Sequence, residues 1–201
     1  MAAARQSGRQ RGEWSTFFAV LLAFAFLAAW ALIPPGVLET TWQGEQRQMT
    51  QWAGEQANRW IASKAADSLR DAAMGAWNAA DGLGGSRFET WMTERLYVTL
   101  LWANLVLYRA HTLLMWGLLG IPLILAASVD GFYVREIRKT AFVSQSPMRY
   151  MLGVRLFRLV TVAMLIWLCL PAPMPIMVAP LVIALVAVSL WLWVANLQKR
   201  L

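Results

Sequence analysis

Residues 15–33 and 176–195 form two stretches of the chain without any charged side chain. At a rise of 1.5 Å per helical residue, each stretch is close in length to the ~30 Å hydrocarbon core of a bilayer. Hydrophobic residues make up 59% of the 201-residue chain and charged residues only 14%. A soluble domain of this size cannot bury so much apolar surface. We therefore predict an all-α, polytopic helical membrane protein with about four transmembrane helices.

The first predicted span is residues 15–33, which follow a polar tail of residues 1–14. A Pro-Pro-Gly sequence at 34–36 ends it, because proline lacks an amide donor and glycine tolerates the turn. A cleaved secretory signal is the alternative, since Ala-Trp-Ala at 29–31 fits a small-x-small cleavage site. The apolar run continues past that site, which favours an uncleaved anchor.

Residues 34–109 form the predicted periplasmic region. Its residues 37–95 are polar overall, and Ala, Gln, Glu and Arg dominate the first forty of them. Because these residues favour helix, we predict a long amphipathic helix. The glycines within residues 82–85 then form a hinge, and a second helix begins near Arg87. The prediction is a long periplasmic helical hairpin between the first and second spans.

The chain contains 12 tryptophans. Most lie at or near the ends of predicted spans, where indole rings gather at the membrane–water interface. Four lie on the predicted outer helices and need another explanation, for which contact with the membrane surface and packing against a partner would each serve. These four are Trp52, Trp60, Trp77 and Trp91.

The second span lies within an apolar stretch that is too long for one bilayer crossing, residues 96–129. A span at 110–129 leaves Arg109 and His111 at the outer interface, where a long cationic side chain can snorkel to water. A span ten residues earlier would bury Arg109 near the midplane, at a cost of roughly 2.5–3.5 kcal/mol. We therefore place the span at 110–129, and Pro122 bends it without ending it.

The remaining chain is divided into a basic loop, two further spans and a short tail, with the third span the shortest. It crosses the bilayer only if Arg155 and Arg158 snorkel. These segments are residues 130–155, 156–172, 176–195 and 196–201.

Lys and Arg exceed Asp and Glu in residues 1–14, 130–155 and 196–201, whereas acidic residues prevail in residues 37–95. The positive-inside rule therefore places the N-terminus and the C-terminus in the cytoplasm. The formal net charge of +7 is explained by this topology. Direct DNA binding is accordingly not expected.

The sequence offers little that could catalyse a reaction. Cys169 is the only cysteine and His111 the only histidine, and no phosphate-binding loop is present. The predicted spans contain no Asp or Glu, which argues against a proton relay. We predict no enzymatic activity, no catalytic residue, no cofactor, no metal and no small-molecule substrate. The alternative is a small transporter or channel component that uses Arg109 and His111 in a pore.

Residues 129–139 predict an amphipathic cytoplasmic helix that leaves the membrane. Its cations could bind anionic lipid headgroups, at about 1 kcal/mol each. They could also form a face that docks a partner protein.

Here the sequence resembles a known family. SVDGFYVREIRK at 128–139, followed by SQSPMRYMLGVRLFRL at 144–159, resembles the signature loop of the integrating conjugative element membrane protein family. In that family a V-D-G-x-x-x-R-x-[IL]-R-[RK] stretch precedes a Ser-containing link and an aromatic-led basic helix. A His commonly follows the aromatic Tyr, but Met151 stands here, so a role for that histidine does not carry over. The matching positions are Asp130, Gly131, Arg135, Arg138, Ser146 and Tyr150.

The resemblance implies an inner-membrane protein that works with type IV secretion subunits in bacterial conjugation. Relatives are encoded with such genes, often near the coupling ATPase. We therefore expect a docking or scaffold subunit in contact with membrane lipids, and the coupling ATPase is one candidate partner. The residues expected to dock a partner or lipid are Asp130, Gly131, Arg135, Arg138, Lys139, Arg149, Tyr150 and Arg155.

Overall fold

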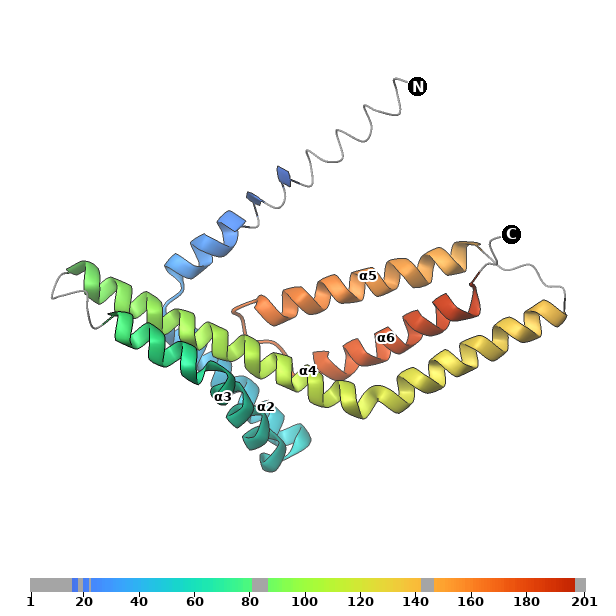
Figure 1. The fold of residues 1–201 in the computed structure, drawn as a ribbon, viewed down its shortest axis with the longest axis horizontal. Helices are drawn as coiled ribbons and strands as arrows, with labels where there is room; N and C mark the ends of the chain where they lie inside the picture. Colours follow the sequence, from blue (N-terminus) through green and yellow to red (C-terminus); the bar gives the residue numbers. More distant parts are fainter. Residues whose placement is uncertain (1–15, 18–19, 22, 81–86, 142–146, 198–201) are drawn as a thin grey trace, which may run out of the picture.

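The computed structural model describes residues 16–17, 20–21, 23–80, 87–141 and 147–197 (Figure 1). Within these ranges every regular element is a helix, which confirms the all-α class. The elements are a first helix over residues 23–32, α2 Pro35–Ala53, α3 Glu55–Ala80, α4 Arg87–Thr140, α5 Pro147–Cys169 and α6 Val178–Ala195.

The longest element is α4, a single helix of 54 residues. Its length of about 81 Å is more than twice the thickness of a hydrocarbon core. Pro122 lies inside it and does not end it, as predicted. Figure 1 shows a bend where the ribbon passes from lime to yellow, the part of α4 that contains this proline.

Three helices of the described chain are long and apolar enough to cross a membrane, and a fourth is possible if one bent pair forms a span. In that pair, residues 23–32 and α2 meet at an angle of 98°. The helix α5 has 23 residues because it begins at Pro147, inside the segment predicted as a loop. The helix is therefore longer than the predicted third span of 156–172, although it ends before residue 172. The bounds of the span itself stay a prediction.

The prediction of one long helix ahead of the glycine hinge is wrong, because the helix breaks at Gly54. This glycine has φ +87°, a backbone conformation that residues with a Cβ rarely adopt. Its N–H donates to the carbonyl of Thr50 and ends α2, and the Asn58 amide donates to the Thr50 hydroxyl across the break at 3.1 Å. The predicted hinge at 82–85 lies outside the described residues, and the next helix begins at Arg87 as predicted.

Glycines set the close packing of α6 against α4 and α5. Gly120 of α4 faces Ile183, and Gly131 lies against the carbonyl of Trp191 further along α6, so these two helices run parallel. Near the start of α5, Gly153 lies against the backbone at Trp193, near the end of α6, so this pair is antiparallel. Small residues let helix backbones approach in this way.

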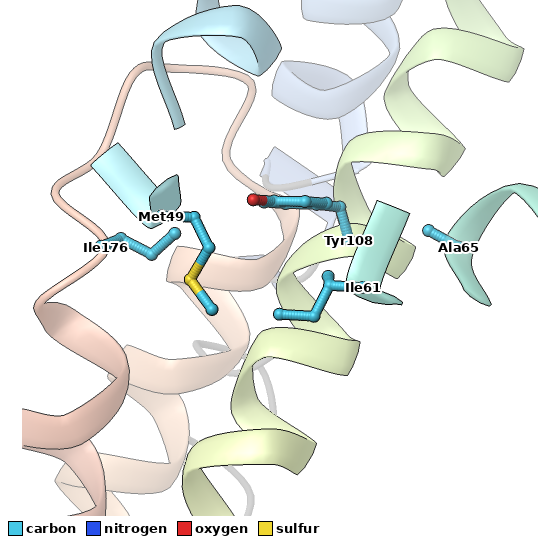
Figure 2. Packing of buried hydrophobic residues seen from close by; sticks show 5 residues of the cluster. All are labelled: Met49, Ile61, Ala65, Tyr108 and Ile176. Carbon is cyan, nitrogen blue, oxygen red and sulfur yellow. The ribbon is translucent and has the colours of Figure 1, made fainter. Parts of the chain in front are cut away.

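The helices α2 and α3 form a hairpin with its tip at Gly54 (Figure 1). A buried cluster joins this α2–α3 hairpin to α4 and to the connection between α5 and α6. In Figure 2, Met49 of α2 lies between Ile176 and the pair Ile61 and Tyr108. Ala65 of α3 completes the cluster. The hairpin is thus fixed to the end of the α5–α6 pair as well as to α4.

The first helix packs against residues 91–107 of α4. The rings of Phe26 and Trp102 lie 4.7 Å apart, and Trp30 contacts Trp91 edge to face. The indole of Trp30 also donates to the Thr99 hydroxyl at 2.8 Å. These contacts of the first helix therefore lie ahead of residue 110 of α4, outside the predicted span 110–129.

Replacing Gly153 by alanine tests the α5–α6 contact. A Cβ added there would lie 2.9 Å from the backbone nitrogen of Trp193, so the helices must separate. We expect Gly153→Ala to lower the free energy of unfolding in detergent micelles by about 1–3 kcal/mol.

Gly117→Ala is the matched control, because its added Cβ would meet only Ile183 Cδ1, at 3.9 Å. Its stability should be equal to wild type or slightly higher, since alanine favours helix over glycine. Equal stabilities of the two variants would contradict the role of Gly153.

Candidate functional site

Arg109 of α4 is buried, with 1% of its surface exposed. Its Nε donates to both carboxylate oxygens of Glu45, at 3.1 Å each, and its Nη2 donates to Oε1 of the same residue. Glu45 comes from α2 and is also buried. The pair therefore connects the hairpin to the longest helix.

The remaining N–H groups of this guanidinium hold the C-terminal end of α5. Nη1 donates to the carbonyls of Trp167 and Leu170 at 2.6 Å each, and Nη2 donates to that of Ala172 at 2.8 Å. The guanidinium carbon also lies 5.5 Å from the centroid of the Trp167 ring. The five N–H donors of arginine thus all have acceptors, and a positive charge stands where the α5 dipole is negative.

The expectation that the Arg109 side chain reaches water is wrong. Glu45 and four backbone or ring groups supply the polar surroundings that water would otherwise supply. The position of Arg109 at the depth of the membrane interface stays a prediction. His111 is half-buried, with its Nδ1 2.8 Å from the carbonyl of Leu107 on its own helix.

Two further arginines of α4 hold the C-terminal ends of helices. Nη1 of Arg95 donates to three carbonyls at the end of the first helix, those of residues 30, 31 and 33, at 3.0–3.1 Å. At the far end, Nη1 of Arg138 donates to Oδ1 of Asn196 at 3.0 Å and to the carbonyl of Ala195 at 3.4 Å, where α6 ends. Each contact satisfies carbonyls that have no partner within their own helix.

The Val-Asp-Gly motif faces α6. Asp130 accepts a hydrogen bond of 2.6 Å from the indole of Trp191. Gly131 is buried, and a Cβ there would lie 3.1 Å from the carbonyl of that tryptophan. With Arg138, these two residues therefore have contacts inside the chain.

The other predicted docking residues occupy different surroundings. Lys139 pairs with Glu136 on the surface of α4, whereas Arg135 and Tyr150 are half-buried. Arg149 and Arg155 are exposed near the start of α5. They line a surface cavity of about 370 Å³, open to its surroundings, together with three apolar side chains of the same helix, those of Met148, Met151 and Leu152.

The comparisons with known proteins agree with a role in conjugation. Residues 36–198 match the model of a family described as IncC plasmid conjugative DNA transfer protein DtrJ-like. The chain belongs to the DtrJ-like family. The chain matches no curated protein and no solved structure. The predicted membership of a conjugation-associated family is thus confirmed, and the link to integrating conjugative elements stays a prediction.

The described part of this DtrJ-like chain contains no candidate metal site. Its His, Cys, Asp and Glu residues within the described ranges form no group of three or more that could hold a metal ion. The sequence prediction of no cofactor and no enzymatic activity remains a prediction.

Sequence reasoning missed Glu45 as the partner of Arg109. One signal was available, because residues 105–113 of this DtrJ-like chain contain no acid that could pair with Arg109 along its own helix. The acid therefore had to come from another element. The outer region holds many acids interleaved with bases, so their positions in the sequence could not single out Glu45.

Removing only one member of the Arg109–Glu45 pair should be far more costly than removing both. In Arg109→Met, a buried carboxylate loses its partner, and we expect a loss of about 3–5 kcal/mol in the free energy of unfolding. The double variant Arg109→Met/Glu45→Met should recover a large part of that loss.

Arg59→Met is the control, because Arg59 also pairs with a glutamate, Glu55, but both side chains are largely exposed. Its stability should change little. Unfolding in detergent micelles measures all three variants, and a double variant no more stable than Arg109→Met would contradict the pairing.

Proposed function

We propose that this protein is a non-enzymatic accessory subunit of a conjugative DNA-transfer apparatus in the bacterial inner membrane, where it docks another subunit. Membership of the DtrJ-like family supports the conjugative role. The helices that are long and apolar enough to cross a membrane support the membrane location.

The docking surface that we propose is the start of α5, and the open cavity there is the observation that supports it. Arg149 and Arg155 flank it, and Met148, Met151 and Leu152 are 50–80% exposed. An amphipathic helix with acidic residues fits this surface, because its carboxylates would pair with the arginines and its apolar side chains would fill the cavity.

Binding of lipid headgroups alone would use the arginines and leave the cavity without a role. The contacts of Asp130, Gly131 and Arg138 with α6 also support this choice of surface. Those residues are engaged within the chain, whereas the start of α5 is exposed. The coupling ATPase is one candidate for the partner.

We place this surface in the cytoplasm. Arg138 of α4 meets the end of α6, and the connection between α5 and α6 lies at the opposite end of these helices (Figure 1). The cations of residues 135–158 therefore gather at one end of the bundle. The positive-inside rule supports a cytoplasmic position for that end.

The transporter alternative receives no support from the described residues. It requires Arg109 to line a pore, but each N–H of this guanidinium has an acceptor within the chain.

A photo-activated cross-linking residue at Met151, in donor cells, tests the docking role. We expect a cross-link to another transfer subunit, and we expect Arg149→Gln/Arg155→Gln to weaken it because the charge pairing is lost. The transfer frequency should fall about tenfold or more, the effect of roughly 1.4 kcal/mol of binding free energy.

Arg70→Gln is the control, since Arg70 is an exposed arginine on α3. It should leave both the cross-link and the transfer frequency unchanged. A cross-link that survives the α5 substitutions, with only lipid binding reduced, would rule out docking at this surface. Normal transfer from a donor that lacks the gene would overturn the accessory role itself.

A further inference from the structure

Trp52 and Trp60 lie on either side of the tip of the α2–α3 hairpin. Trp52 is close to the end of α2 and Trp60 is in the second turn of α3, and their exposed fractions are 60% and 43%. Large exposed aromatic side chains on a helical tip indicate a surface that contacts something else. The depth of this tip relative to the membrane indicates what these side chains contact.

Residues 170–177 connect α5 to α6. Both helices are long and apolar enough to span, and the connection between them is irregular. Irregular backbone exposed to hydrocarbon would leave its polar groups without hydrogen bonds. The connection therefore lies where the bilayer meets water.

The hairpin tip touches this connection directly. The backbone N–H of Ile176 donates to Oε1 of Gln48 at 2.9 Å. The Ile176 side chain is buried in one cluster with Met49 and Ile61, as Figure 2 shows. Trp52 follows Met49 within one helical turn, and Trp60 directly precedes Ile61. Both indoles therefore belong to the membrane boundary.

We infer that the hairpin tip rests in the interfacial layer of the surrounding bilayer and that Trp52 and Trp60 anchor it there. Indole places an apolar ring among acyl chains and its N–H near headgroups, which suits this layer. Residues 51–60 contain one acid and one base, Glu55 and Arg59, which pair with each other. The attraction is therefore apolar and does not require anionic lipid.

One other exposed tryptophan provides an internal contrast. Trp77 is 46% exposed. It lies about 26 Å along α3 from Trp60, and α3 runs from the hairpin tip toward the start of α4 (Figure 1). Trp77 therefore lies away from the boundary, and the inference leaves it in water. The inference does not depend on the docking role proposed for α5.

Spin labels can measure the depth of each position. In a Cys169→Ser background, which removes the only cysteine, single cysteines are placed at positions 52, 60 and 77 of the full chain in phosphatidylcholine nanodiscs. Labels at 52 and 60 should collide more with oxygen than with a water-soluble nickel complex, and the label at 77 should show the reverse. If the labels at 52 and 60 collide with the nickel complex as often as the label at 77, the inference is overturned.

Quenching by brominated phosphatidylcholine provides a second measurement with conservative variants. Trp52→Phe/Trp60→Phe should lose part of the quenchable tryptophan fluorescence, whereas Trp77→Phe should keep it. Replacing a third of the lipid by phosphatidylglycerol should leave both results unchanged. A loss of quenching in Trp77→Phe equal to that in Trp52→Phe/Trp60→Phe would contradict anchoring by the hairpin tip. Dependence on phosphatidylglycerol would contradict its apolar basis.

Discussion

The buried contact of Arg109 with Glu45 and with the end of α5 joins four parts of the chain, namely α2, α4, α5 and the residues that follow α5. A guanidinium taken out of water needs a counter-charge and acceptors for all its donors. Here α2 supplies the carboxylate, and α5 with the following residues supplies the carbonyls. Because four segments must be in place together, this contact fixes the position of the hairpin relative to the α5–α6 pair.

Hydrogen bonds from arginines to the carbonyls at helix C-termini recur along the whole of α4. Arg95, Arg109 and Arg138 stand beside the last carbonyls of the first helix, α5 and α6. Carbonyls at a helix end have no partner within the helix, and the dipole makes that end negative. One long helix with arginines at spaced positions can therefore set where three other helices end. This is a physical reason for one uninterrupted element of 54 residues.

The sequence predicted the elements that depend on local composition, and it missed those that depend on distant contacts. The helical class, the passage of α4 through Pro122 and the helix start at Arg87 follow from hydropathy and proline or glycine positions. The break at Gly54 was missed because a lone glycine in a helical pattern carries no local sign of a positive φ. The role of Glu45 was missed because its partner lies 64 positions away in the chain.

The Val-Asp-Gly motif shows why a recognisable sequence pattern does not by itself locate a binding surface. Asp130 and Gly131 match the family pattern, yet they hold α4 against α6 through the Trp191 indole and backbone. Glycine favours this close approach because a Cβ there would lie only 3.1 Å from a backbone carbonyl. That preference is independent of any partner. Residues that bind a partner must therefore be sought among the side chains that remain exposed after the contacts within the chain are made. In this chain these include the arginines at the start of α5 and the indoles at the hairpin tip.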